Sequence, residues 1–197
     1  MDRIIHGLLR ASRAIDVINS KIGKYLAWLV LIAILISATN ATVRKVFDQS
    51  SNAWLELQWI LFSAVFLLCS PWTLISNEHI RIDIVNNAFP KKVRDIIDVV
   101  GHGFFLLPLT IIMIVTSYPV LVESIRINEQ SFSAGGLPQW PAKSLILIGF
   151  VLLFAQGLSE FIKRIAVMRG LIPDPYEKRQ STAVSEAEAA AKAVEVR

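Results

Sequence analysis

Residues 54–75 read WLELQWILFSAVFLLCSPWTLI, an apolar run long enough to cross a lipid bilayer as a single helix. The middle of this run, residues 60–70, lacks the polar stripe that a helix on the surface of a soluble protein carries. Helices of soluble bundles are also shorter, with a mean of about 11–12 residues. The stretch therefore predicts a transmembrane helix.

Three further apolar blocks of similar length lie at about 25–43, 99–121 and 142–162. Charged residues are 18% of the chain and hydrophobic residues 54%, whereas soluble domains carry about 25% charged residues. We therefore expect an all-α integral membrane protein in which residues 1–170 form a single domain with four transmembrane helices. The polar, Ala/Glu-rich stretch 171–197 is expected to be a disordered cytoplasmic tail.

Lysine and arginine are distributed unevenly between the segments that join these blocks. Residues 1–24, the loop 76–95 and the segment from Lys163 onward hold sixteen of the chain's 20 lysines and arginines, whereas 41–52 and 121–143 hold two each. Because positive charge marks the cytoplasmic side of a membrane protein, both termini should be cytoplasmic. The net charge of +4 then follows from topology and does not indicate binding to nucleic acid.

Two segments have the character of helices that lie in the membrane interface. Residues 1–22 combine basic side chains with apolar residues at helical spacing, namely Ile4, Leu8, Ala11, Ile15 and Ile18. A second interfacial segment is expected between the second and third spans, where apolar residues recur after Pro90. The first apolar block begins only after 24 mixed residues, so we do not expect a cleavable signal peptide.

Glu56 lies near the outer end of the second span, with Gln58 and Trp59 beside it. An ionisable side chain in this position is a candidate functional residue. It could bond to another membrane helix or subunit, or it could simply reach water, and a proton-coupled role has less support from a single carboxylate. Trp140 is expected at the headgroup level, where aromatic rings are enriched.

A polar group follows the second span and consists of Asn77, His79, Arg81 and Asp83. Either it contacts a partner or lipid headgroups, or it is ordinary cytoplasmic surface. His102 could in principle ligate haem, but the usual arrangement needs two histidines at matching depth. The chain's other histidines, His6 and His79, fall in interfacial segments, so we expect His102 to be a hydrogen-bonded histidine and predict no cofactor or metal.

Motifs of catalysis or energy coupling are missing from the sequence. There is no phosphate-binding loop, nucleophile elbow or HExxH motif, and the single cysteine, Cys69, cannot form an internal disulfide. A stand-alone secondary transporter is expected to carry a pair of glycine-interrupted spans that repeats in its two halves, and this sequence has no such pair. The pattern is typical of a membrane subunit that assists another protein rather than of an enzyme.

Four motifs carry a resemblance to a known family: WLELQWILFSAVFLL (54–68), NEHIRID (77–83), GGLPQWPAKS (135–144) and LLFAQGLSEFIKRI (152–165). In this order, and placed on four spans, they resemble the small membrane subunit of TRAP transporters, the DctQ-like family. The last two are similar to the branch labelled mannitol/chloroaromatic or 2-oxo-acid type. The resemblance covers about residues 10–170.

The resemblance implies an accessory subunit of a sodium-driven importer of organic carboxylates in the bacterial inner membrane. Its partners would be a large membrane subunit, whose scaffold it would brace, a periplasmic binding protein, which it would help to dock, and membrane lipids. On matching motifs, Glu56, Gln58 and Trp59 would contact the large subunit, and the group from Asn77 to Asp83 would contact scaffold or lipid. Two alternatives are a membrane anchor of a redox enzyme and the small subunit of a tripartite tricarboxylate transporter.

Overall fold

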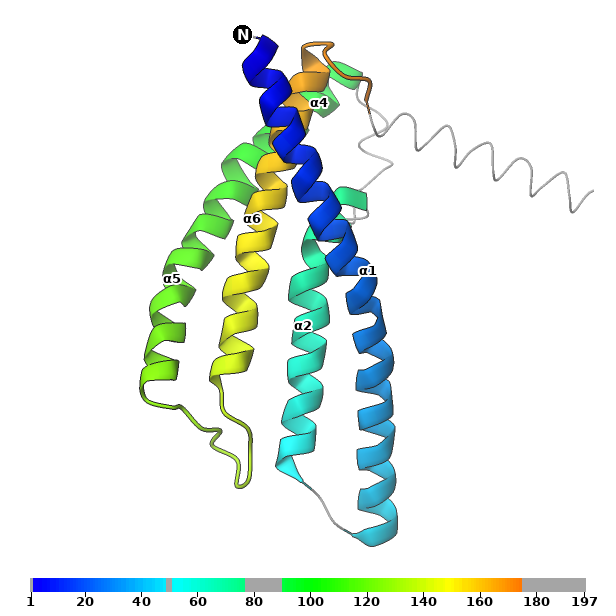
Figure 1. Ribbon diagram of the computed structural model, residues 1–197, viewed down its shortest axis with the longest axis vertical. Coiled ribbons are helices and arrows are strands. Elements are labelled where there is room, and N and C mark those ends of the chain that lie inside the picture. The colour runs from blue at the N-terminus through cyan, green and yellow to red at the C-terminus, as the bar shows by residue number, and fades with distance from the viewer. Residues whose placement is uncertain (1, 49–50, 77–89, 175–197) are drawn as a thin grey trace, which may run out of the picture.

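The computed structural model describes residues 2–48, 51–76 and 90–174, and its regular elements are all helices (Figure 1). A single isolated bridge pairs Gln130 with Pro138. The helices are α1 (Asp2–Phe47), α2 (Asn52–Ser76), α4 (Lys91–Val100), the π-helical η1 (Gly101–Leu106), α5 (Leu107–Arg126) and α6 (Trp140–Met168).

Four helical stretches are long and apolar enough to cross a membrane: Gly7–Phe47, Asn52–Ser76, Val93–Arg126 and Trp140–Met168. This confirms the predicted all-α fold with four membrane-spanning helices. The helices exceed the predicted spans, because α4, η1 and α5 follow one another without a break and α6 continues past residue 162.

Helix α1 is continuous through the point where we expected an interfacial helix to end and a span to begin. It has 46 residues, which corresponds to about 69 Å and is more than twice the thickness of a hydrocarbon core. The predicted segment 1–22 is thus the first part of α1. Its position at a membrane interface stays a prediction, as does that of the second interfacial segment, whose residues 77–89 lie outside the described part.

In the lower part of Figure 1 the long helices lie side by side in a layer in the order α5, α6, α2, α1, and toward the end that carries the N-terminus α1 crosses α6. Helix α6 packs against α1, α2 and α5, and α4 and η1 lie against it as well. Three glycines allow the close approach. A Cβ added at Gly23 would lie 2.7 Å from the Trp72 ring, and one at Gly149 or Gly157 would lie 2.9 Å from a leucine of the facing helix. Small residues serve the same purpose between membrane helices in general.

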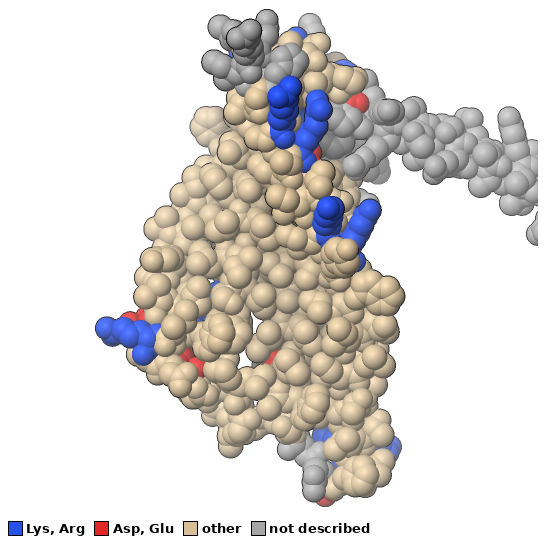
Figure 2. All heavy atoms as spheres, in the orientation of Figure 1, with Lys and Arg blue, Asp and Glu red and all other residues tan. Residues whose placement is uncertain are grey.

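The exterior of this layer is apolar and its buried positions are largely polar. Phe66, Phe104 and Phe105 are 79%, 78% and 72% exposed. The buried polar or charged side chains are Ser12, Asn19, Asp95, His102, Thr110, Ser124, Gln156, Ser159, Glu160 and Arg164. Figure 2 shows a face made mostly of uncharged residues, with Lys and Arg gathered mainly toward the end that carries the N-terminus. Such a surface suits a surrounding bilayer, in which exposed apolar side chains are solvated by lipid.

Candidate functional site

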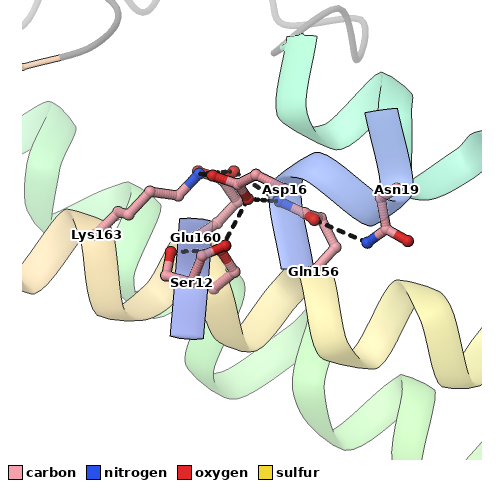
Figure 3. Close-up of polar contacts among 7 residues, drawn as sticks. Ser12, Asp16, Asn19, Gln156, Glu160 and Lys163 are labelled. Carbon is pink, nitrogen blue, oxygen red and sulfur yellow. Dashed lines mark hydrogen bonds and ion pairs between the residues drawn. The ribbon is translucent and has the colours of Figure 1, made fainter. Parts of the chain in front are cut away.

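A polar cluster joins the first half of α1 to the second half of α6 (Figure 3). We call it the inner polar cluster, and its members are Ser12, Asp16, Asn19, Gln156, Ser159, Glu160 and Lys163. The α1 members follow one another at intervals of four and three residues. On α6, Ser159 and Glu160 are adjacent, and each lies three or four residues from Gln156 and from Lys163. These spacings place each set on one face of its helix.

Gln156 is the centre of this cluster and is 0% exposed. Its Oε1 accepts a hydrogen bond from Asn19 at 2.9 Å, and its Nε2 donates to Asp16 at 2.8 Å and to Glu160 at 3.0 Å. The amide therefore has partners for both of its ends, which is the condition for keeping such a group in a medium of low dielectric constant.

Asp16 connects the cluster to the end of α6. It accepts hydrogen bonds from Gln156 Nε2, from Ser159 Oγ at 2.9 Å and from Lys163 Nζ at 3.0 Å. Because a carboxylate only accepts, Ser159 donates to Asp16, which leaves Ser12 as the donor in the 2.6 Å contact between the two serines. Lys163 also bonds Glu160 at 2.5 Å. Lys163 is thus the cation that the Asp16 and Glu160 carboxylates share.

Arg164 holds α4 against α6. Its guanidinium contacts Asp95 at 3.1 Å and also Asp98, both from α4, and it lies 3.4 Å from Asp174, which follows α6. The Arg164 side chain is 7% exposed. The planar fork of donors in arginine suits several carboxylates at once, which lysine could not match. We call this group the Arg164 cluster.

Both clusters lie far from the start of α6. The helix rises about 30 Å over the 20 residues from Trp140 to Glu160, which is about the thickness of a hydrocarbon core. Were Trp140 to lie at one membrane interface, the inner polar cluster would lie near the opposite one, where polar groups are less costly than at the bilayer centre.

At the other end of the helices, Glu56 holds the loop that joins α5 to α6. We call residues 127–139 the α5–α6 loop. Glu56 accepts a hydrogen bond from Ser131 Oγ through one oxygen and from the Leu137 backbone N–H, at 2.7 Å, through the other. Asn52 adds a bond from its side chain to the Ala134 carbonyl at 3.0 Å. A Cβ at Gly136 would lie 2.7 Å from Glu56 Oε1, so the glycine permits this contact.

The loop is also fixed by its own backbone. After α5, Asn128 adopts a left-handed conformation (φ 47°), and the Asn128 and Glu129 N–H groups bond the carbonyls of Ile125 and Ser124, as in a Schellman cap. Ser131 N–H bonds the Leu137 carbonyl at 3.2 Å, and Gln139 N–H bonds the Glu129 carbonyl at 2.9 Å. These bonds close the loop on itself.

An ion pair between Glu129 and Lys143 ties the base of the loop to α6. The hydrogen bond from the Lys143 ammonium holds the pKa of the Glu129 carboxyl below its ordinary value. The carboxylate is therefore ionised, and the pair complete, across the neutral pH range.

The structure places some of the predicted site residues, and others lie outside its described part. Trp59 is 68% exposed and Trp140 is 43% exposed at the start of α6, while Gln58 is half-buried. Glu56 bonds within its own chain, and a contact with another subunit stays a prediction. Asn77, His79, Arg81 and Asp83 lie outside the described residues. His102 Nδ1 lies 2.6 Å from the Asp98 carbonyl, as expected of a hydrogen-bonded histidine.

Sequence reasoning missed the residues of the inner polar cluster and the Arg164 cluster. They had a signal, because polar residues recur at helical spacing in both α1 and α6. We interpreted residues 1–22 as an interfacial helix and gave Ser12, Asp16 and Asn19 no role, whereas these three side chains bond to α6.

The chain was compared with protein families, curated proteins and solved structures. Residues 24–167 match the sequence profile of the tripartite ATP-independent periplasmic transporters, DctQ component. Neither the curated proteins nor the solved structures gave a significant match. The family profile spans well over half of the chain and covers all four long helices from Lys24 onward. The protein therefore belongs to the DctQ family, the small membrane component of TRAP transporters, and is a transporter subunit rather than an enzyme.

Proposed function

We propose that this chain braces the large membrane subunit of a sodium-coupled importer of organic carboxylates. The observation that carries the proposal is the joining of α1, α4 and α6 by the inner polar cluster and the Arg164 cluster. A brace must keep its shape while its partner moves. Helices tied by buried, mutually satisfied polar groups resist sliding, because each shift would leave charged groups without partners.

The apolar exterior supports the same role. Exposed apolar side chains run along α1, α2, α5 and α6, so the layer offers wide faces to lipid and to the helices of a larger subunit. Helix α5 packs on α6 at the edge of the layer (Figure 1). We propose that Glu56, Gln58 and Trp59 lie at the contact with the large subunit, and that the group from Asn77 to Asp83 contacts scaffold or lipid.

The charge distribution supports an orientation in a bacterial inner membrane with both termini in the cytoplasm. In this orientation the inner polar cluster lies at the cytoplasmic interface, and the α5–α6 loop faces the periplasm. The loop is then available to a periplasmic binding protein. The substrate follows only from the branch resemblance, which points to 2-oxo acids or other monocarboxylates.

Membership in the DctQ family favours this function over a redox-enzyme anchor and over the small subunit of a tripartite tricarboxylate transporter. The identity of the partner tests the choice. Affinity purification of the tagged chain from native membranes in mild detergent should recover one much larger polytopic protein of the TRAP type. Recovery of a haem protein with a Soret band, or of a tricarboxylate-type large subunit, would refute the proposal.

A further inference from the structure

The outward face of α1 changes in chemistry along the helix. At 3.6 residues per turn, its exposed members lie within about a third of the helix circumference, opposite Ser12, Asp16 and Asn19, which bond to α6. These exposed members are Arg10, Arg13, Lys21, Lys24, Trp28 and Leu31. Figure 2 shows basic side chains in two groups along the first half of this helix. Cations therefore come first, followed by an aromatic ring and then by an aliphatic side chain.

The four cations of this outward face have no ion-pair partner in the part of the chain that the structure describes. Asp16 is the only acidic residue between positions 3 and 47, and it points inward, where Lys163 and two further α6 side chains bond to it. On α6, by contrast, Lys143, Lys163 and Arg164 are all ion-paired. The outward face of α1 therefore offers positive charge to an anionic partner that its neighbouring helices do not supply.

Lys21 and Lys24 differ from the two arginines because they adjoin the apolar span. Side chains of a helix lean toward its N-terminus, so both ammonium groups reach back toward the level of the inner polar cluster. Tyr25 and Trp28 follow within the next turn and are 75% and 66% exposed. Aromatic rings gather at the headgroup level of a membrane, and cations directly before a span attract anionic headgroups.

The order of these groups matches a phospholipid better than it matches a protein surface. In one lipid molecule the phosphate, the glycerol ester and the acyl chain follow one another, as do the ammonium groups, the aromatic rings and Leu31 along this face. A protein that covered the face would remove both ammonium groups from water, which is costly unless it brings carboxylates of its own. A headgroup would pair with them and leave them hydrated.

We propose that Lys21, Lys24, Tyr25 and Trp28 bind one anionic phospholipid, with both ammonium groups on its phosphate and both rings against its glycerol backbone. The inference rests on the membrane-spanning α1 and not on the proposed bracing function. Arg13 precedes Lys21 by eight residues, which is about 12 Å along the helix axis, whereas the headgroup layer on each side of a bilayer is roughly 5–8 Å deep. The two arginines therefore lie outside this site.

The test measures the lipid affinity of the full chain, purified in mild detergent, by native mass spectrometry during titration with phosphatidylglycerol. Lys21→Gln/Lys24→Gln should raise the Kd by about 30-fold, from about fivefold for each cation, and should abolish the preference over phosphatidylcholine. Arg10→Gln/Arg13→Gln removes the same charge from the same face and is the matched control, which should stay within about threefold of wild type. Equal losses in the two variants would indicate only diffuse attraction and would overturn the inference.

A charge-preserving variant guards against a trivial loss of folding. Lys21→Arg/Lys24→Arg should bind phosphatidylglycerol within about threefold of wild type, because both cations remain next to the phosphate. A loss as large as that of the glutamine variant would contradict a site built on charge.

Two further measurements identify the occupant. Glycerol phosphate, which has the headgroup chemistry without acyl chains, should not displace the lipid, and displacement would assign a soluble anion instead. The titration is then repeated on the chain in complex with its large subunit. A lysine-dependent preference that persists there supports the lipid, whereas its loss would assign the face to the large subunit and overturn the inference. If transport proceeds at the full rate without this chain, the proposed function fails and this inference stands.

Discussion

Arg164→Met would separate α4 from α6 while keeping a side chain of similar length. The arginine contacts Asp95, Asp98 and Asp174, whose side chains are only 10%, 10% and 7% exposed. Methionine would leave these three carboxylates close together without their shared cation. Lys91 lies 3.8 Å from Asp174 and could compensate only part of the charge.

Removing one partner of a buried ion pair costs about 3–5 kcal/mol. In the proposed orientation the Arg164 cluster lies at a membrane interface, where water would partly solvate the carboxylates, so we expect about 3 kcal/mol. For chains of this length, 1 kcal/mol corresponds to about 2–4 °C, which predicts a fall in the melting temperature of about 6–12 °C.

The assay is a thermal melt of the purified protein in detergent, followed by size-exclusion chromatography of a fluorescent fusion. Arg169→Met is the matched control, because Arg169 lies at the exposed end of α6 and the substitution removes the same charge. It should shift the melting temperature by less than about 2 °C, in line with surface substitutions. Equal shifts for the two variants would refute the reasoning that the Arg164 cluster holds α4 to α6.

Three further outcomes concern the α5–α6 loop. Glu56→Ala removes both bonds from Glu56 to the loop and should speed hydrogen exchange at the Leu137 amide. It should also lower the yield of complex with the large subunit more than it alters substrate affinity. The control Glu123→Ala should change neither the exchange nor the yield. Gly136→Ala should speed the same exchange, because its Cβ would displace Glu56, and adding it to Glu56→Ala should have little further effect; additive effects would argue against a shared contact. An NMR titration should give the Glu129 carboxyl a pKa below its ordinary value. Its ion pair with Lys143 should therefore be complete above the ordinary pKa and be lost as the pH falls through the lowered pKa. Replacing its lysine partner with methionine should raise that pKa.

The four spans could be predicted from the sequence because a bilayer demands long apolar helices, and no tertiary detail is needed to recognise them. The block at 54–75 corresponds closely to α2 (Asn52–Ser76). Helix ends were less predictable. The first block was expected to begin near Tyr25, but polar residues that face another helix let α1 continue without a break.

The partners of polar side chains could not be predicted from the sequence. Asp16 and Gln156 lie 140 positions apart, and the spacing within each helix does not show which face of the other it meets. For Glu56 the position near the span's end was recognisable, but its bonds to Ser131 and Leu137 depend on how the loop folds back. A glycine pair such as 135–136 is typical of an irregular turn, but only the folded loop shows that a Cβ at Gly136 would meet Ser131 and Glu56.

Solute uptake with and without this chain tests the central claim most directly. The large subunit and the binding protein are reconstituted in proteoliposomes with an inward sodium gradient, with or without the small subunit, at equal amounts of the large one. We predict sodium-dependent import of a carboxylate substrate only when the small subunit is present, and reduced import with Arg164→Met but not with Arg169→Met. Full uptake by the large subunit and binding protein alone would contradict the account.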